Sequence, residues 1–271
     1  MTKQKKPAGT VNEFGVQWTK YTENTGFYAS TGIFDSLFGN LLCKEDLAGK
    51  KIADIGAGSG RYTKLFHQLG AASILALEPS DGFTTLEKNT ADLQNVTRLH
   101  ATADQLPRQD FDWVFCIGVL QFIPDAQTAL RTMGRALGPR GRIFVWVYGR
   151  ENNGIYLIFL KPLRLIAKLL PHRLLDLMAA VLVYPATLYG LLCRVIPLPM
   201  AQYLCGYYMK LDRYSRKVVI YDQLNPGYSR YYSKAELKEL FENSGFTDLQ
   251  FYNRLNTSWS VTARYGERES T

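Results

Sequence analysis

A glycine-rich loop is the first feature of the sequence that could do chemistry. It reads DIGAGSG over residues 54–60 and stands between an apolar run and a stretch with helical spacing. Glycines in such a loop allow a tight turn and a close approach of the backbone to a ligand. The helix that follows offers unpaired N–H groups and a positive potential. Because nucleotide-like ligands bind outside the carboxyl ends of such strands, the loop predicts a site for a ligand of that kind.

The glycine spacing narrows the choice of ligand. A dinucleotide site requires GxGxxG, whereas Gly56, Gly58 and Gly60 form GxGxG, so that the third glycine falls one position early. Asp54 precedes the first glycine by two residues. Its charge would repel a diphosphate but would attract the cationic sulfonium and amino group of S-adenosylmethionine (SAM). The pattern therefore favours SAM, and a nicotinamide-dependent oxidoreductase is the alternative enzyme class.

Two further acids follow expected strands. Glu78 ends the apolar run at 73–78, where a carboxylate accepts hydrogen bonds from both hydroxyls of a ribose. The alternative for Glu78 is a solvated charge at a strand end. Asp104 lies in ATADQLP (101–107) and could accept a hydrogen bond from an adenine amino group, with a helix N-cap as the alternative.

The elements that must position these residues alternate between strand and helix. Short apolar runs predict strands, and helical spacing with capping residues predicts helices. Helix 125–137 has Asp125 as its cap, and helix 233–244 opens with the capping box of Ser233 and Glu236. This alternation predicts an α/β fold with helices on both faces of a parallel sheet. Strands are expected at 50–57, 73–78, 96–101, 111–117, 142–148, 246–252 and 257–264, and helices also at 61–69, 82–90, 155–170 and 174–196.

Residues 51–148 resemble the class I SAM-dependent methyltransferases of the small-molecule type (methyltransferase type 11/12-like). The resemblance rests on IADIGAGSG, ALEPSDG, ATADQLP and FDWVFCIGVLQFIPD, which stand in that family's order and spacing. It implies a Rossmann-like, doubly wound, seven-stranded sheet with a mostly helical insertion after the fifth strand. It also implies SAM as the cofactor and transfer of a methyl group as the reaction.

The resemblance assigns roles to residues of the site. In that family the glycine loop holds the methionine part of SAM, an acid like Glu78 holds the ribose, and the region of Asp104 flanks the adenine. The aromatic segment at 14–21 resembles an N-terminal cap, which would place Trp18 and Tyr21 near the cofactor rather than on the outside of the sheet. The expected cofactor-binding residues are Trp18, Tyr21, Asp54, Gly56, Ala57, Gly58, Gly60, Glu78, Pro79, Ala103, Asp104, Gln105, Ile117, Gly118 and Val119.

The sequence departs from the family where a base is expected. The family often has two histidines after Gly-Val-Leu, and this chain has Gln121 and Phe122, whose alternative role is loop packing. Catalysis is therefore expected to rest on positioning and desolvation, with Gln121, Tyr148 and Asp222 as the candidate catalytic residues. The missing histidines also leave open a non-catalytic SAM-fold adaptor for a membrane or a partner.

The length and composition of the chain limit the number of domains that it can form. The chain has 271 residues, of which 46 % are hydrophobic. We expect a cap segment at 1–45 and one methyltransferase domain at 46–271, with an insertion at 150–230. The spacing of the four cysteines and three histidines predicts no metal site. The N-terminal MTKQKKP is followed by no apolar stretch of a secretory signal, which predicts a cytoplasmic protein.

The insertion holds most of the positive charge. Nine Lys and Arg stand against three acids between 151 and 217, and the whole chain carries a net +8. Two interpretations stay open: a hydrophobic lid or dimer surface, or peripheral membrane contact through 155–200 with basic residues toward acidic head groups. Both favour a small hydrophobic, lipid-linked or glycan-type acceptor over nucleic acid. The expected reaction is transfer of the methyl group to an oxygen of this acceptor, with nitrogen or carbon as the alternative. The oligomeric state stays open.

Overall fold

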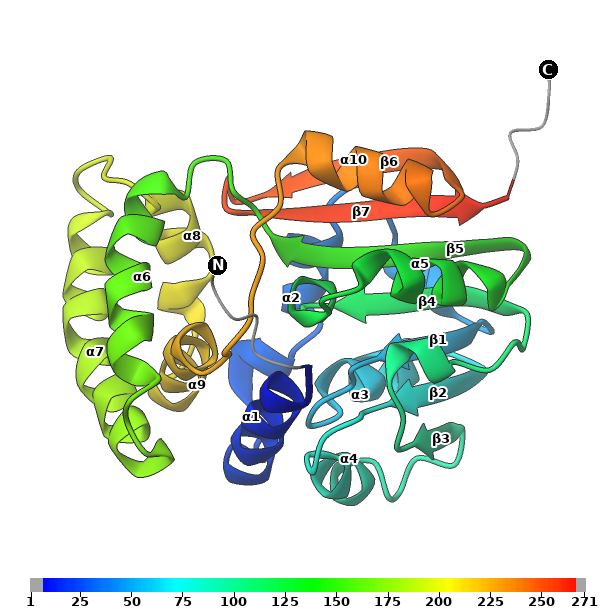
Figure 1. Cartoon of the computed structure of the whole chain (residues 1–271), viewed down its shortest axis with the longest axis horizontal. Coiled ribbons are helices and arrows are strands. Elements are labelled where there is room, and N and C mark those ends of the chain that lie inside the picture. The colour runs from blue at the N-terminus through cyan, green and yellow to red at the C-terminus, as the bar shows by residue number, and fades with distance from the viewer. Residues whose placement is uncertain (1–6, 267–271) are drawn as a thin grey trace.

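A seven-stranded sheet organises the chain (Figure 1). The computed structural model describes residues 7–266, so the expectations for the N-terminal MTKQKK lie outside the described residues. The strands follow the order β3-β2-β1-β4-β5-β7-β6, with β7 antiparallel to its two neighbours and the others parallel. The fold class and the strand number predicted from the sequence are confirmed. The strands are β1 (Lys51–Ile55), β2 (Ser73–Leu77), β3 (Val96–Leu99), β4 (Phe111–Ile117), β5 (Leu137–Tyr148), β6 (Phe246–Arg254) and β7 (Ser258–Tyr265).

Both faces of the sheet are buried, which explains the continuous apolar runs of the central strands. In β4, Phe115 packs into one core cluster, whereas Val114 and Cys116 pack into the other. One face is covered by α2 (Gly32–Phe38), α3 (Arg61–Gln68) and α4 (Phe83–Asn89). The opposite face is covered by α5 (Ala126–Arg135) and α10 (Lys234–Asn243).

The capping predictions are confirmed at two helices. The Asp125 side chain accepts a hydrogen bond from the N–H of Thr128 at the start of α5. Ser233 and Glu236 form a reciprocal capping box at α10. The fifth strand is longer than expected, because residue 137 already pairs with the start of β4 before a register shift.

The helices of the insertion stand beside the sheet rather than on it (Figure 1). They are α6 (Gly154–Ala167), α7 (His172–Leu192), α8 (Ala201–Gly206) and α9 (Arg213–Leu224). The first helix, α1 (Pro7–Lys20), lies between α9 and the sheet, so it can cover the edge where the strands end. The sequence did not predict α2, α8 or α9, which are short or carry mixed patterns.

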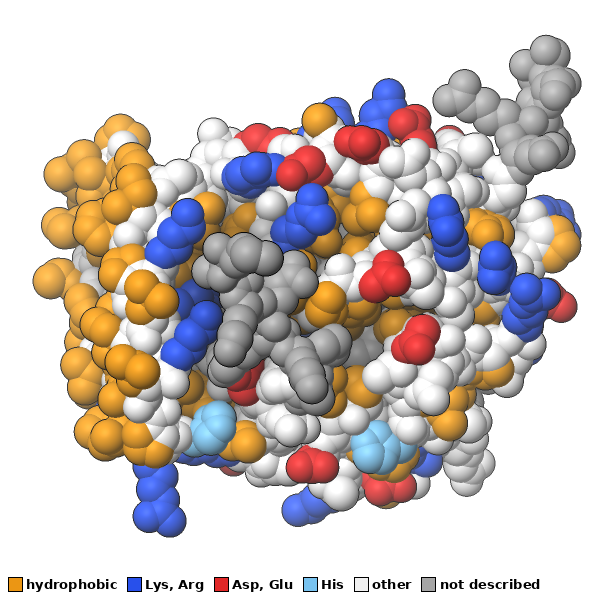
Figure 2. Space-filling model, in the orientation of Figure 1, with side chains coloured by type: hydrophobic (Ala, Val, Ile, Leu, Met, Phe, Trp, Pro, Cys, Tyr) orange, Lys and Arg blue, Asp and Glu red, His pale blue; other side chains and the backbone are white. Residues whose placement is uncertain are grey.

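The outer face of the insertion is apolar. Sixteen of the 17 exposed large hydrophobic side chains of the described residues fall between 155 and 196. Figure 2 shows this face as a continuous apolar area over α6 and α7. Single exposed apolar side chains are ordinary, whereas a contiguous patch of this kind marks a contact surface.

Candidate functional site

A cavity of about 410 Å³ opens at the carboxyl ends of the central strands. Gly56 follows β1, Glu78 follows β2, and Gly118 follows β4, and all three line the cavity. The chain leaves β1 toward β2 and β3 on one side, while β4 and β5 lie on the other side. The cavity is therefore at the topological switch point of the sheet, where open α/β folds bind their ligands.

Glycines shape the floor of this cavity. Gly56 has a φ of +69°, and a Cβ at this position would lie 2.5 Å from a methyl carbon of Val119. Gly58 has a φ of +57°, and its Cβ would lie 3.0 Å from the indole of Trp18. Both the left-handed backbone and the lack of space require glycine, so the loop is shaped to bring its backbone against a ligand.

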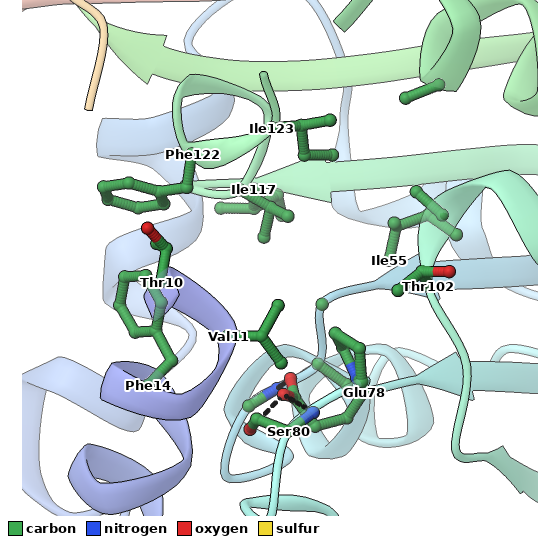
Figure 3. Close-up of a pocket in the computed structure, with 18 of the residues that line it drawn as sticks. Thr10, Val11, Phe14, Ile55, Glu78, Ser80, Thr102, Ile117, Phe122 and Ile123 are labelled. Atoms are coloured by element: carbon green, nitrogen blue, oxygen red, sulfur yellow. Dashed lines mark hydrogen bonds between the residues drawn. The ribbon is translucent and has the colours of Figure 1, made fainter. Parts of the chain in front are cut away.

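Glu78 fixes the glycine loop from the end of β2. One of its carboxylate oxygens accepts a hydrogen bond from the backbone N–H of Gly58 at 2.8 Å. The other accepts from the backbone N–H of Ser80 at 3.0 Å and from the Ser80 hydroxyl, as Figure 3 shows. Burial raises the pKa of Glu78, although these donors oppose the shift. A carboxylate offers about four acceptor positions, so it can still bind a ligand hydroxyl.

Asp54 does not line the cavity, which corrects the expectation that it meets the ligand directly. It is buried, and its carboxylate accepts a hydrogen bond from the Thr63 hydroxyl at 2.6 Å. Side chains alternate along a strand, so Asp54 shares the α3 face of β1 with Ile52. Burial raises the pKa of Asp54 to about 6. Asp54 therefore ties β1 to the first turn of α3 and positions the loop between them.

Helix α1 forms the wall opposite the glycine loop. Thr10, Phe14 and Trp18 recur at the spacing of one helix face and line the cavity together with Val11. Figure 3 shows Thr10 and Phe14 beside Phe122, and the Phe14 and Phe122 rings pack with their centroids 4.7 Å apart. The backbone carbonyl of Trp18 accepts a hydrogen bond from Thr85 of α4 at 2.9 Å. Trp18 therefore lines the cavity in which the cofactor is expected.

Tyr21 is not brought to the cavity. It follows the last residue of α1, and its hydroxyl donates a hydrogen bond to Asp176 of α7. Its ring packs edge-on against Tyr221 of α9, with ring centroids 5.1 Å apart. The expectation that Tyr21 contacts the cofactor is therefore corrected: it joins the cap to the insertion.

A second, smaller cavity of about 160 Å³ adjoins the first. Its walls come from β5, α6, α8, α9 and the end of β6, and eight of its 21 lining residues belong to the insertion. Nine of its 21 lining residues are aromatic, which favours a flat ligand. Six residues line both cavities: Trp18, Arg61, Tyr62, Ile117, Gly118 and Asp222.

Asp222 is the carboxylate at the junction of the two cavities. Its two oxygens accept hydrogen bonds from the Tyr148 hydroxyl at 2.7 Å and from the Gln17 amide at 2.9 Å. Burial raises the pKa of Asp222, and the two hydrogen bonds oppose that rise. Burial also holds the pKa of Tyr148 well above its ordinary value, so Tyr148 stays a hydrogen-bond donor. A carboxylate held in this way can take a proton from a ligand hydroxyl.

The structure gathers most of the expected cofactor residues at the first cavity. Gly60 instead begins α3 with a φ of +82°, and Gln105 accepts hydrogen bonds from Thr102. Gln121 is fully buried outside both cavities, and its side-chain amide has no hydrogen-bond partner, so the structure does not support a catalytic role for it. The expected residues that line the first cavity are Trp18, Gly56, Ala57, Gly58, Glu78, Pro79, Ala103, Asp104, Ile117, Gly118 and Val119.

Several residues of the two cavities were not expected from the sequence. Arg61 lines both cavities and stacks its guanidinium 3.8 Å from the ring centre of Tyr28. Its place directly after the last glycine of the loop is the signal that could have identified it. Arg254 lines the second cavity from the end of β6, and no local pattern of the sequence marks it.

Comparisons with known proteins agree with this geometry. Residues 53–145 match the family described as "Methyltransferase domain". Ubiquinone biosynthesis O-methyltransferase of Pseudomonas fluorescens SBW25 is 30 % identical over 133 residues, which are 47 % of this chain and 56 % of that protein. The counterpart from Pseudomonas aeruginosa LESB58 is 32 % identical over 46 % of this chain and 56 % of that protein. The match thus spans little more than half the length of these relatives.

Two solved structures share the fold over nearly the whole chain. A 1,6-didemethyltoxoflavin-N1-methyltransferase of Burkholderia thailandensis has a TM-score of 0.55 at 16 % identity, covering 98 % of this chain and 93 % of its own. Magnesium protoporphyrin IX methyltransferase of Synechocystis PCC 6803 has a TM-score of 0.54 at 12 % identity, covering 98 % and 100 %. Residues 53–145 thus match a methyltransferase domain, and the chain shares the fold of these two solved methyltransferases. Both cavities meet at Gly118 and Asp222.

Proposed function

We propose that this chain binds SAM in the first cavity and transfers its methyl group to an oxygen of a small hydrophobic or lipid-linked acceptor in the second. The observation that carries the proposal is the junction of the two cavities at Gly118 and Asp222. A methyl donor and an acceptor must meet in line at one point, and a shared wall offers such a point. The names of the curated relatives, which are O-methyltransferases, support oxygen as the acceptor atom.

The residues of the first cavity fit SAM. The Gly56 and Gly58 backbones leave room for the methionine part, and buried Glu78 offers acceptor positions to ribose hydroxyls. Asp104 lies across the same cavity, where it can accept from an adenine amino group. Arg61 stacks on Tyr28 where the two cavities adjoin.

Asp222 is the proposed proton acceptor. When bound, SAM would supply an electrophilic methyl group for the acceptor oxygen, with S-adenosylhomocysteine as the leaving group. The hydroxyl proton of the acceptor passes to Asp222, whose raised pKa suits it to hold a proton. Tyr148 and Gln17 hold the carboxylate in place by their hydrogen bonds. Trp18 and the rest of α1 exclude water from the junction.

Calorimetry with S-adenosylhomocysteine (SAH), the demethylated product, tests the cofactor site. We expect micromolar binding by the natural chain, and a loss of tenfold or more in Glu78→Gln, because its amide cannot accept at both positions. Glu87→Gln is the matched control, since Glu87 is exposed on α4. No binding at millimolar SAH would reject the proposal. Tighter binding of NADH than of SAH would instead support the alternative that the chain is a nicotinamide-dependent oxidoreductase.

The insertion is the proposed membrane-contacting surface of the enzyme. Helix α7 is long and apolar enough to span a membrane, but β6 and β7 complete the same sheet as β1 to β5, which a single crossing would divide. The exposed charges on α6, α7 and the turn after them are basic, as at Lys161, Lys168 and Arg194. The one acid of the two helices, Asp176, forms ion pairs with Lys20 and Lys217.

This distribution favours helices lying in the surface of an anionic membrane. Each large apolar side chain that leaves water gains roughly 1.5–3 kcal/mol, and nearby cations are attracted to acidic head groups. A lipid-linked acceptor would then be presented where the second cavity begins, because α6 contributes Tyr156 to its wall.

Flotation with vesicles tests the membrane contact. We expect the chain to float with phosphatidylcholine vesicles containing phosphatidylglycerol, and Phe159→Glu/Leu169→Glu to stay in solution, because these side chains are 67 % and 85 % exposed. Gln109→Glu, in an exposed loop, is the control and should float. SAH binding by each variant confirms folding. A natural chain that does not float, or that forms a dimer broken by the double substitution, would reject membrane contact in favour of a dimer surface.

A further inference from the structure

The second cavity contains a buried cation, Arg254, that forms no ion pair with an acidic side chain among residues 7–266. Arg254 is only 4 % exposed, and its Nε donates to the Ser36 hydroxyl at 3.0 Å. Its Nη2 is buried without a hydrogen-bond partner. A buried guanidinium without a counterion is unfavourable unless a ligand supplies one. Within residues 7–266, the arginines that form ion pairs are Arg142, Arg150, Arg230 and Arg264.

Aromatic rings pack against this guanidinium but provide no hydrogen-bond acceptor for its Nη2. It lies 4.6 Å from the ring centre of Tyr207 and 5.6 Å from that of Trp146. The indole N–H of Trp146 is also buried without an acceptor, and Trp146 lines the same cavity. Two neighbouring donors of this cavity therefore lack an acceptor. Buried polar groups are almost always paired, so this pair of donors indicates a missing acceptor group.

We infer that the methyl acceptor is an aromatic compound with an anionic substituent, a carboxylate in the first instance, which Arg254 and the Trp146 N–H recognise. The inference rests on the proposed methyl transfer and adds the chemical class of its acceptor. Arg254 lines only the second cavity, whereas Asp222 lines both the first and the second cavity. The anionic group is thus held apart from the Asp222 carboxylate, and the hydroxyl to be methylated lies toward Asp222.

The same arrangement selects against a neutral acceptor. A ring without an anionic group would keep water from Arg254 and leave its Nη2 without an acceptor, and a buried charged donor without an acceptor is unfavourable. Guanidinium groups bind planar carboxylates with good geometry. We therefore expect an acid to bind tenfold to a hundredfold more tightly than its neutral isostere.

Calorimetry on SAH-saturated protein tests this preference. The probes are the three isomeric hydroxybenzoates and the corresponding hydroxybenzamides, which have the same shape but no charge at pH 7.5. We expect at least one hydroxybenzoate to bind ten times more tightly than its amide. In Arg254→Gln the two should bind alike, and in Arg254→Lys part of the preference should return. Arg264→Gln removes an exposed arginine from β7 and should keep the full preference.

The outcomes separate this inference from the proposed function. If SAH itself does not bind, the proposed function fails. If SAH binds but each acid and its amide bind equally, or none of the probes binds, the acidic acceptor is rejected and the SAM site stands. If Arg254→Gln does not fold, the comparison of acid and amide in the natural chain still decides. A preference that survives Arg254→Gln would also overturn the role of Arg254.

Discussion

Asp54→Asn gives a prediction whose sign and size follow from the burial of one carboxyl group. Burial raises the pKa of Asp54 from 3.8 to about 6, despite the hydrogen bond from Thr63. A raised pKa means that the folded chain binds the proton more tightly than the unfolded chain. Asp54 therefore contributes stability below about pH 4 that is lost as the pH rises through 6. One pKa unit corresponds to about 1.4 kcal/mol, so the whole loss is ~3 kcal/mol.

About 2 kcal/mol of this loss falls between pH 4.5 and 7.5. The asparagine side chain does not ionise in this pH range, and its amide oxygen can still accept a hydrogen bond from the Thr63 hydroxyl. The unpaired amide N–H of asparagine costs about 1–2 kcal/mol, but this cost does not depend on pH. The free energy of unfolding of Asp54→Asn should therefore rise by about 2 kcal/mol relative to the natural chain between these two pH values.

Urea unfolding followed by tryptophan fluorescence at half-unit steps of pH measures this difference. Every other titrating group is common to both proteins, so it cancels from the comparison. Asp92→Asn is the control, because Asp92 is exposed, and its curve should run parallel to that of the natural chain. If the Asp54→Asn curve is parallel as well, Asp54 is not the strained carboxyl group that its burial indicates.

Three further predictions concern the cavities. Gly56→Ala should weaken SAH binding at least a hundredfold, as measured by calorimetry, because its Cβ would overlap Val119. Trp18→Ala should weaken SAH binding about tenfold, a loss of roughly 1.4 kcal/mol, because it removes the indole that closes the cavity. Tyr148→Phe removes a hydrogen bond that lowers the pKa of Asp222. The acidic limb of the kcat/KM profile with pH should therefore move to higher pH, and an unmoved limb would argue against Asp222 as the base.

The first cavity was predictable because its residues follow the strands directly. Gly56, Glu78 and Gly118 each stand at a strand end, and parallel strands bring such ends to one edge. Asp54 was misassigned, although the alternation of the strand itself places it with Ile52 under α3. The position of Asp54 beside the glycine-rich loop indicated that it lies near the ligand. Whether Asp54 contacts the ligand depends on the direction of its side chain, which points toward α3.

The second cavity could not be predicted, because its walls come from segments that only tertiary packing unites. Arg254 ends an antiparallel strand, Trp146 lies in β5, and Tyr207 lies just after α8. Each of these residues in isolation has an ordinary local explanation. The prediction that Tyr21 lies at the first cavity was wrong for a related reason. Helix α1 ends at Lys20, and the side chain of Tyr21 contacts α7 instead of continuing the face of α1 that lines the cavity.

Helix α6 connects the proposed membrane surface to the proposed acceptor cavity. Its Tyr156 lines the cavity, whereas Ile158 and Phe159 are 69 % and 67 % exposed on the outer face. Residues two positions apart on a helix, such as Tyr156 and Ile158, point in different directions, so one helix serves both surfaces. An aromatic acid with an apolar tail could then keep its tail in the lipid while its ring enters the cavity. The proposed membrane contact and the proposed acidic acceptor would together account for an apolar outer face beside a cavity that contains a buried arginine.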